Sequence, residues 1–279
     1  MDQLDKLVQT IQASRKYRHV SPALVRAVGA RELAVRPRLK EAVKATKNKL
    51  HQVGGAYFEA AIDYERALTE LETTTSILET LRQIMALHSS TRERLPILDE
   101  FYATTLADLP PIHTVLDLAC GLNPLARPWL PLSKTTRAEP AEATCTEPAE
   151  VAVYQASDIY ADMVHFLNQA MSLLGWPGQA TVRDLLTDPP TESVDLALLL
   201  KAVPCLDQLD REVVPRLLDS LPAKYWLISF PVHSLGGRSK GMVETYEGRF
   251  VELMNGRNWT YQRFQFETEL AFLVRTQIE

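Results

Sequence analysis

The sequence predicts an all-helical N-terminal region followed by an α/β domain with a mostly parallel sheet. Before Pro110–Pro111, apolar residues recur only at helical spacing. After these prolines, short apolar runs alternate with helical segments, a pattern typical of parallel sheets with helical crossovers. Within 116–126, an apolar strand ends in Asp117 and turns sharply through Gly121. Doubly wound domains bind nucleoside-bearing ligands at such a turn, because the crevice lies at the carboxyl end of the first strand.

The helical region spans residues 1–109. Ser21 is expected to cap the second helix, with Pro22 at its first position. The basic helix that follows ends near Gly54–Gly55. Apolar spacing predicts helices near 4–11, from residue 22 onward, and over 38–51, 57–71, 75–87 and 91–106.

The α/β domain spans residues 110–279. Apolar runs predict strands over 115–118, 151–156, 180–183, 194–200 and 226–230, with helices over 163–174 and 212–221. Two further runs, 259–266 and 269–275, are expected to pair antiparallel at one edge. Residues 133–150 are rich in Thr, Ala, Glu and Pro and nearly lack large apolar side chains, which predicts a flexible surface insertion.

The composition is that of a globular protein, with 46% hydrophobic and 23% charged residues. No apolar run reaches the roughly 20 residues that a membrane-spanning helix needs. The first ten residues lack the apolar core of a secretion signal. The 3 cysteines are scattered and predict neither a disulfide framework nor a zinc site. We therefore expect a cytoplasmic protein without a bound metal ion or a membrane partner.

Charge is distributed unevenly along the chain. Residues 1–109 carry 16 basic and 14 acidic side chains, whereas residues 110–279 carry 14 and 21. Within the first part, residues 15–49 hold 11 basic and 2 acidic side chains, a formal charge of +9. A local field of this size attracts a polyanion although the whole chain has a net charge of −5. The alternative interpretation is an ordinary solvated helical surface.

Charged side chains stand at the carboxyl ends of four predicted strands: Asp117, Asp158, Asp184 and Lys201. Each one alone is compatible with an exposed loop, but the carboxyl ends of parallel strands meet at one edge of the sheet. A carboxylate after the second strand can accept hydrogen bonds from both ribose hydroxyls. Asp184 can face the exocyclic amine of an adenine, and Lys201, which follows an apolar run, is expected to face the same pocket.

Two polar segments flank this predicted pocket. The segment 88–95 contains residues that can cap a helix, and Arg94 is placed to hold a carboxylate through two parallel hydrogen bonds. Plain helix capping with a surface arginine is the alternative. The loop 229–242 combines Gly236–Gly237 with positive charge, which suits an anionic substrate, although a mobile solvated connection is equally compatible.

Together these segments resemble the aminoglycoside-resistance methyltransferases that modify 16S rRNA at N7 of guanine 1405 in the decoding site. The matching motifs cover nearly the whole chain: SRKY (14–17), KLHQVGGAY (49–57), HSSTRERLPILDEFY (88–102), LDLACGLNPLARPWLP (116–131), LLLKAVPCLD (198–207) and SFPVHSLGGRSKGM (229–242). The chain departs from the family pattern at Ala119, where glycine is frequent, at Val243, where an acid is common, and in its longer insertion over 133–150.

The resemblance implies a Rossmann-like methyltransferase domain, with a seven-stranded and mostly parallel sheet, behind a helical domain that docks on the 30S ribosomal subunit. It implies S-adenosylmethionine as cofactor. The sequence does not fix the oligomeric state, and a monomer bound to one subunit is the simplest expectation. Arg94 would hold the methionine carboxylate and Lys201 would position the target base. The other implied cofactor contacts are Asp117, Ala119, Gly121, Asn123, Asp158, Ile159, Asp184 and Leu185. The expected contacts to 16S rRNA are Arg15, Lys16, Lys44, Lys47, Lys49, His233, Arg238 and Lys240.

Guanine N7 carries a lone pair and no proton, so the implied reaction needs alignment of the reacting atoms rather than a general base. Two alternative functions are compatible with the sequence. A methyltransferase of another rRNA position, such as adenine N1, would call for stacking aromatic side chains, and only Trp176 and Trp226 stand near the expected site, Trp226 within a strand. A non-catalytic ribosome-binding factor with a vestigial pocket is the other.

Overall fold

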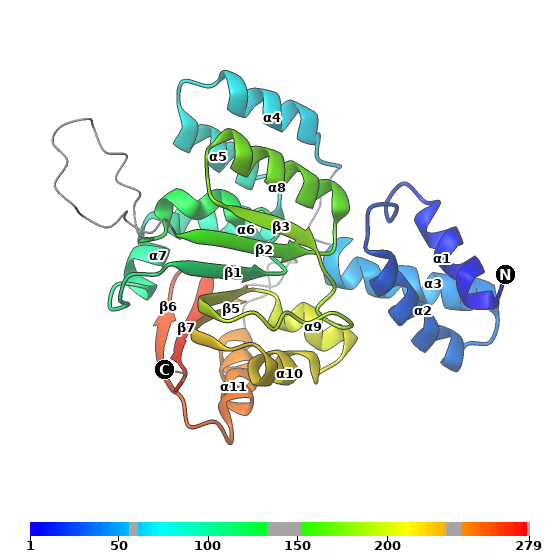
Figure 1. The fold of residues 1–279 in the computed structure, drawn as a ribbon. Helices are drawn as coiled ribbons and strands as arrows, with labels where there is room; N and C mark the ends of the chain where they lie inside the picture. The colour runs from blue at the N-terminus through cyan, green and yellow to red at the C-terminus, as the bar shows by residue number, and fades with distance from the viewer. Residues whose placement is uncertain (56–60, 133–151, 233–240, 278–279) are drawn as a thin grey trace, which may run out of the picture.

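The computed structural model describes residues 1–55, 61–132, 152–232 and 241–277. Its centre is a seven-stranded sheet of order β3-β2-β1-β4-β5-β7-β6 (Figure 1). Strands β1 to β5 pair parallel, whereas β7 pairs antiparallel with both β5 and β6, which confirms the predicted sheet. The strands are β1 (Thr114–Leu118), β2 (Val153–Asp158), β3 (Gly178–Val182), β4 (Val194–Leu200), β5 (Ala223–Pro231), β6 (Thr260–Gln265) and β7 (Glu269–Arg275).

Helices precede the sheet and connect its strands. In the N-terminal region they are α1 (Gln3–Gln12), α2 (Pro22–Val35), α3 (Leu39–Leu50), the π-helical turn η1 (His51–Gly55), α4 (Tyr64–Thr73), α5 (Ile77–Met85), α6 (Ser89–Arg94), the 3₁₀ turn η2 (Leu95–Ile97) and α7 (Leu98–Thr105). Among the strands lie the 3₁₀ helix η3 (Asn123–Trp129), α8 (Ala161–Leu173), α9 (Val203–Leu209), α10 (Val213–Ser220) and α11 (Met242–Met254).

The helices depart from the predicted pattern at four places. The expected helix over 91–106 is divided at η2, because Pro96 has no backbone N–H to continue the ladder. The fourth helix begins at Tyr64 and not at residue 57, since Asp63 caps it by accepting the N–H of Arg66 at 3.0 Å. Apolar spacing predicted neither α9, which is a single short helix of seven residues, nor α11.

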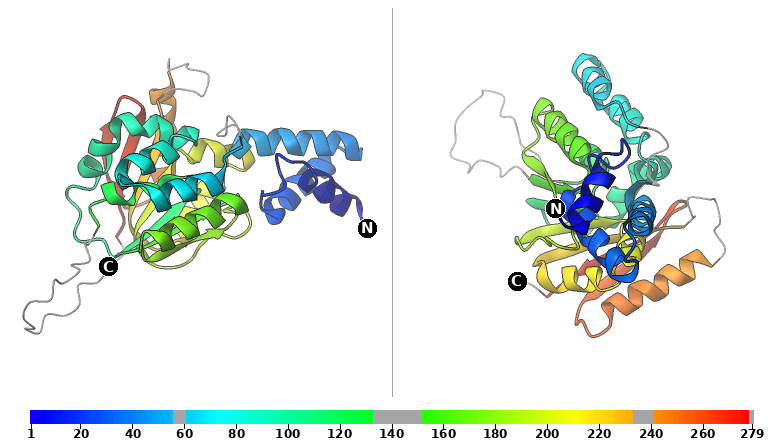
Figure 2. Two further views of the ribbon diagram at one scale, coloured as in Figure 1. Left: turned by 90° about the horizontal axis from the view of Figure 1, so that it is seen from above. Right: turned by 90° about the vertical axis from the view of Figure 1, so that its right-hand side faces the viewer.

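The helical region divides into two parts (Figures 1 and 2). Helices α1 to α3 form an N-terminal lobe that projects from the body, whereas α4 to α7 pack on the body itself. The Tyr64 ring of α4 stacks on Phe166 of α8 with ring centroids 5.1 Å apart. The rings of Phe101, from α7, and Phe266, just after β6, have centroids 5.2 Å apart. Within the region that was predicted to dock on the ribosome, only the N-terminal lobe therefore stands away from the sheet.

Backbone hydrogen bonds join the N-terminal lobe to the body. Val20 forms an antiparallel bridge with Tyr160, just after β2. The Ser21 N–H donates to the Ile159 carbonyl at 2.8 Å, and the Ala161 N–H donates to the backbone carbonyl of His19 at 2.8 Å. As predicted, the Ser21 side chain caps α2, accepting the N–H of Leu24. These contacts place the lobe above the carboxyl ends of the parallel strands.

The central strands explain why apolar runs marked them so clearly. Leu196 to Leu199 of β4 and Trp226 to Ile228 of β5 are almost wholly buried, because helices or the neighbouring elements cover both faces of the sheet. Trp226 thus lies within a strand, as predicted. None of the helices in the described ranges is long and apolar enough to cross a bilayer. The predicted insertion over 133–150 lies outside the described residues.

Candidate functional site

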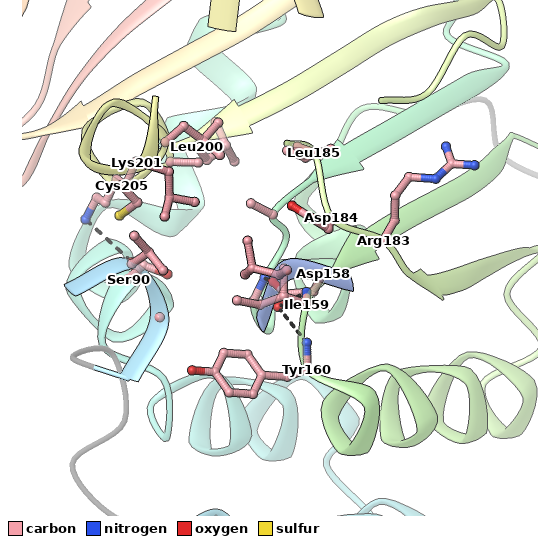
Figure 3. Close-up of a pocket in the computed structure, with 18 of the residues that line it drawn as sticks. Ser90, Asp158, Ile159, Tyr160, Arg183, Asp184, Leu185, Leu200, Lys201 and Cys205 are labelled. Atoms are coloured by element: carbon pink, nitrogen blue, oxygen red, sulfur yellow. Dashed lines mark hydrogen bonds between the residues drawn. The ribbon is translucent and has the colours of Figure 1, made fainter. Parts of the chain in front are cut away.

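A cavity lies between the carboxyl edge of the sheet and the N-terminal lobe (Figure 3). The space between its walls, including the part open to solvent, amounts to about 740 Å³. The lobe side contributes Leu24, Val53 and Gly54. The sheet side contributes the segments that follow β1, β2, β3 and β4: Ala119, Gly121, Asp158, Ile159, Tyr160, Asp184, Leu185, Lys201 and Ala202.

The turn after β1 brings the backbone to the cavity wall. Ala119 and Gly121 adopt left-handed conformations, with φ of 51° and 53°. A Cβ atom at Gly121 would lie 2.8 Å from Cε1 of His88, so this position requires glycine for space as well as for conformation. Ala119 adopts the left-handed conformation at a cost of about 1–2 kcal/mol. The departure from the family pattern at Ala119 therefore leaves the turn in place.

Asp158 stands at the end of β2 and is 8% exposed. Its carboxylate accepts three backbone N–H groups, those of Gly121 at 2.9 Å, Ile159 at 2.7 Å and Tyr160 at 3.3 Å. Burial raises the pKa of Asp158, and the backbone donors oppose that rise. A carboxylate has about four acceptor sites, so about one remains for a ligand hydroxyl.

Asp184 and Leu185 follow β3 and form the neighbouring wall. Asp184 accepts the Leu186 N–H at 2.9 Å and the Thr187 hydroxyl at 2.8 Å, and burial raises its pKa. Arg183 also lines the cavity, but in Figure 3 its guanidinium points away from Lys201 and Ser90, and it pairs with acids at the surface. The Asp184 carboxylate can accept a hydrogen bond from the edge of an adenine ring, and the Leu185 side chain can pack on its face.

Lys201 follows β4 on the opposite side of the cavity and is 3% exposed. Its backbone is left-handed, with φ of 58°, and its N–H donates to the Ser229 carbonyl at 3.0 Å. The ammonium group lies 3.0 Å from the Glu93 carboxylate and 3.4 Å from Glu269. It also donates to the Ser90 carbonyl at 3.5 Å (Figure 3). The sheet edge, α6 and β7 thus fix this lysine together.

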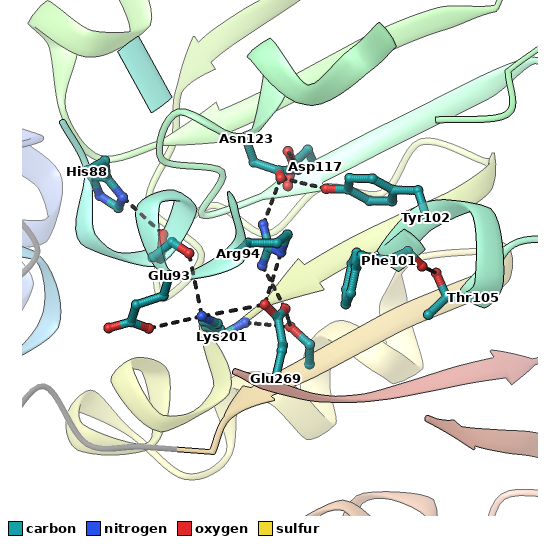
Figure 4. A network of polar contacts seen from close by, with 12 residues as sticks. His88, Glu93, Arg94, Phe101, Tyr102, Thr105, Asp117, Asn123, Lys201 and Glu269 are labelled. Atoms are coloured by element: carbon teal, nitrogen blue, oxygen red, sulfur yellow. Dashed lines mark hydrogen bonds and ion pairs between the residues drawn. The ribbon is translucent and has the colours of Figure 1, made fainter. Parts of the chain in front are cut away.

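A buried polar network lies beneath the cavity (Figure 4). Arg94 binds Glu269 through two hydrogen bonds, from Nε at 3.0 Å and from Nη2 at 2.7 Å. Its Nη1 donates to the Asn123 side-chain oxygen at 2.8 Å. The Asn123 amide in turn donates to Asp117 at 2.8 Å. Arg94, Asn123 and Asp117 were predicted to contact the cofactor; the structure places them outside the cavity wall, as the support of the turn after β1.

Burial sets the charges in this network. It raises the pKa of Asp117 to about 7, against the opposing hydrogen bonds from Asn123 and Tyr154. The Oδ1 atom of Asp117 has no hydrogen-bond partner within the described part of the chain. Burial would also raise the pKa of Glu269, but the charges of Arg94 and Lys201 outweigh it and leave that pKa below its usual value.

Sequence patterns missed several residues of the site. His88 lines the cavity, although a lone histidine reads more readily as a packed core residue. Burial, followed by the charges of Arg92 and Arg94, lowers the pKa of His88 to about 4, so the ring is neutral at pH 7. Tyr160 and Ser90 also line the cavity. The available signal for Glu269 was an acid at the head of the strongly apolar strand β7.

The predicted RNA contacts differ in their environments. Arg15, Lys16 and Lys44 are exposed on the N-terminal lobe, whereas Lys47 and Lys49 are partly buried. His233, Arg238 and Lys240 lie outside the described residues. Within the described ranges, no cluster of His, Cys, Asp or Glu side chains is arranged to hold a metal ion.

Comparison with known proteins gives a consistent picture. The model of the family described as ribosomal RNA methyltransferase (FmrO) matches residues 13–273. A 16S rRNA (guanine(1405)-N(7))-methyltransferase of Micromonospora echinospora is 36% identical over 98% of this chain and 97% of the relative. One of Serratia marcescens with the same description is 29% identical, over 98% of each chain. The crystal structure of 16S rRNA methyltransferase RmtF in complex with S-adenosyl-L-homocysteine is 29% identical, covers 99% of this chain and 100% of its own, and has a TM-score of 0.81.

Proposed function

This chain belongs to the ribosomal RNA methyltransferase (FmrO) family, and on that premise we propose that it methylates N7 of guanine 1405 in the 16S rRNA of the 30S subunit. Whole-length similarity to enzymes of that specificity carries the proposal. The convergence of seven predicted cofactor and target residues on one cavity supports it: Ala119, Gly121, Asp158, Ile159, Asp184, Leu185 and Lys201.

The cofactor is S-adenosylmethionine, which supplies an electrophilic methyl group when bound. The cavity fits its adenosyl part. Asp158 keeps acceptor capacity for a ribose hydroxyl, and Asp184 with Leu185 offers an acceptor and an apolar face to the adenine. The left-handed turn at Ala119 and Gly121 lets the backbone approach the ligand closely.

Arg94 has a more limited part in this proposal. Three of the five N–H bonds of a guanidinium are engaged by Glu269 and Asn123. Because Arg94 is buried and does not line the cavity, contact with the methionine carboxylate would need the turn after β1 to move. The principal work of Arg94 is to fix Asn123, and through it the loop after β1.

Lys201 positions the target base. Lysine is a common partner of guanine O6, the acceptor beside N7. All three protons of the ammonium face acceptors on Glu93, Glu269 and Ser90, so one of these must be exchanged for the base. Glu93 has 33% of its side chain exposed and can turn into solvent, whereas Glu269 is fully buried. No residue needs to remove a proton, because N7 carries none.

The exposed cations of the N-terminal lobe supply the docking surface. Arg15 and Lys44 make no ion pair within the described residues, so their charges are available to phosphates. We expect binding to 30S subunits to weaken steeply with salt, since phosphate contacts release counterions. Lys44→Glu with Arg15→Glu is expected to weaken subunit binding and to leave cofactor binding unchanged. As the substrate is ribosomal, the protein acts in the cytoplasm, as a single copy on each subunit.

No tryptophan lines the cavity within the described residues. Trp226 is buried in β5, and the Trp176 ring packs against Arg127, whose guanidinium carbon lies 5.6 Å from the ring centroid. The described lining therefore offers no tryptophan for stacking on an adenine, and its aromatic rings are those of Tyr160 and His88.

The decisive experiment is to incubate the protein with 30S subunits and labelled S-adenosylmethionine and to map the modified nucleotide. Cleavage after borohydride and aniline, which is selective for 7-methylguanosine, should add one stop of reverse transcription, next to position 1405, that untreated subunits lack. Asp158→Ala should give no stop. A stop elsewhere, or label on an adenine, would contradict the proposal, and absence of cofactor binding would point to the vestigial alternative. Cells expressing the active protein should resist aminoglycosides, and those expressing Asp158→Ala should not.

A further inference from the structure

We propose that Arg31 and Lys49 of the N-terminal lobe are positioning residues for the cofactor cavity, because they hold the C-terminal end of α9, which forms one of its walls. The Arg31 guanidinium, from α2, donates to the Leu209 carbonyl at 2.9 Å and pairs with Asp210 at 3.3 Å. The Lys49 ammonium, from α3, donates to the Gln208 carbonyl at 3.1 Å.

These contacts suit the chemistry of a helix end. The last four carbonyls of a helix have no intrahelical donor and carry partial negative charge. Gln208 and Leu209 are the last residues of α9, so two lobe cations satisfy carbonyls that the helix itself leaves open. Short helices depend on such outside contacts, since seven residues are too few to be stable alone.

The same helix forms a wall of the cavity. Cys205, Leu206 and Leu209 line it, and Lys201 stands directly before the helix. Leu209 joins the two features, because its carbonyl accepts from Arg31 while the residue itself lines the cavity. Figure 1 shows α9 on the side of the body that faces the lobe.

The lobe holds the opposite wall as well. Its backbone bonds to Ile159 and Ala161 and its bridge to Tyr160 fix the segment after β2, which carries the ribose side of the cavity. Tyr160 also packs closely on η1, where a Cβ atom at Gly54 would lie 2.7 Å from its hydroxyl. One lobe therefore spans the cavity from wall to wall, and its placement sets the width between them.

Cofactor affinity and lobe placement are consequently linked, and such linkage is reciprocal. This inference rests on the proposed function, since it takes the cavity to be the S-adenosylmethionine site. It also changes the role of Lys49, which was predicted to contact RNA. Arg31 has half of its side chain exposed, so an RNA phosphate can compete with the end of α9 for its guanidinium. Docking on RNA then changes the position of α9, and with it one wall of the cavity.

The test measures binding of S-adenosylhomocysteine by calorimetry in the absence of RNA. The double variant Arg31→Gln/Lys49→Gln is expected to raise the dissociation constant by about threefold to tenfold. The matched control, Arg15→Gln/Lys44→Gln, removes two exposed lobe charges that have no partner among the described residues, and should stay within about twofold of the unchanged protein. Arg31→Lys with Lys49 intact keeps a cation at the helix end and should bind nearly as the unchanged protein does.

Equal dissociation constants for the two double variants would overturn the inference. If the unchanged protein does not bind S-adenosylhomocysteine, the proposed function fails instead. Hydrogen exchange gives a second measurement that is independent of the ligand. Amides of α9 should exchange faster in Arg31→Gln/Lys49→Gln than in the control variant. Equal exchange rates at α9 would also contradict the proposal that Arg31 and Lys49 hold this helix.

Discussion

Arg94 and Glu269 lie 175 residues apart in the chain and form a fully buried, doubly hydrogen-bonded ion pair, with distances of 3.0 and 2.7 Å. Glu269 also faces Lys201 at 3.4 Å and accepts the Ser229 hydroxyl at 2.5 Å. A single carboxylate on β7 therefore balances two cations, one from α6 and one from the end of β4. This pairing joins the helical region to the sheet beneath the cavity.

Glu269→Gln should lower the free energy of unfolding by about 3 kcal/mol, because it leaves two buried cations without their shared counterion. Urea unfolding followed by circular dichroism measures the change. Glu70→Gln is the matched control, since it removes the acid of the exposed Arg66–Glu70 pair and should cost less than about 1 kcal/mol. Equal losses in the two variants would show that the buried pair does not hold the fold.

Asp158→Ala should weaken S-adenosylhomocysteine binding by roughly 10- to 100-fold, the loss expected when a charged acceptor is removed from ligand hydroxyls. Calorimetry measures the affinity. Asp162→Ala changes a nearby acid that does not line the cavity and should bind normally. Normal binding by Asp158→Ala would remove Asp158 from the proposed ribose site.

Asp117 should make stability depend on pH. Its pKa is about 7 in the folded protein and near 3.8 when unfolded, so the stability it contributes is present below pH 4 and is lost as pH rises to 7. Relative to Asp117→Asn, the unchanged protein should lose roughly 2 kcal/mol between pH 5 and pH 8.

His88 makes the comparison with the variant necessary. Its lowered pKa of about 4 acts in the opposite direction, because stability rises with pH between 4 and 6.5. Both proteins contain His88, so its effect cancels in the difference between them. A difference in unfolding free energy that stays constant from pH 5 to pH 8 would contradict the raised pKa of Asp117.

Gly121→Ala should destabilise the protein more than Gly256→Ala does. Both glycines have a positive φ, of 53° and 78°, so both variants lose about 1–2 kcal/mol through backbone strain. Only at Gly121 does the added Cβ meet a buried ring, His88, at 2.8 Å, whereas nothing lies within 4 Å at Gly256. Thermal unfolding compares the two. Equal shifts in Tm would mean that the His88 ring moves aside without any loss of stability.

The sequence by itself determined the sheet and the edge at which the site lies. Strands buried on both faces must be apolar throughout, so β4 and β5 were visible as local runs. Parallel strands gather their carboxyl ends, which brought Asp158, Asp184 and Lys201 together without knowledge of any contact. The motif resemblance then indicated the family and its methyl-transfer reaction, and the family match agrees with both.

Only the tertiary structure decided which side chains pair and which face the cavity. Glu269 reaches Arg94 because β7 runs antiparallel beside β5, with Glu269 opposite Pro231, and no spacing along the chain encodes that register. Arg94, Asn123 and Asp117 support the turn from below because buried polar groups are stable when they pair with one another. Likewise, Lys49 binds the end of α9 because the lobe folds back over the sheet. Local pattern fixes strands and their ends, whereas contacts between distant segments depend on how those elements pack.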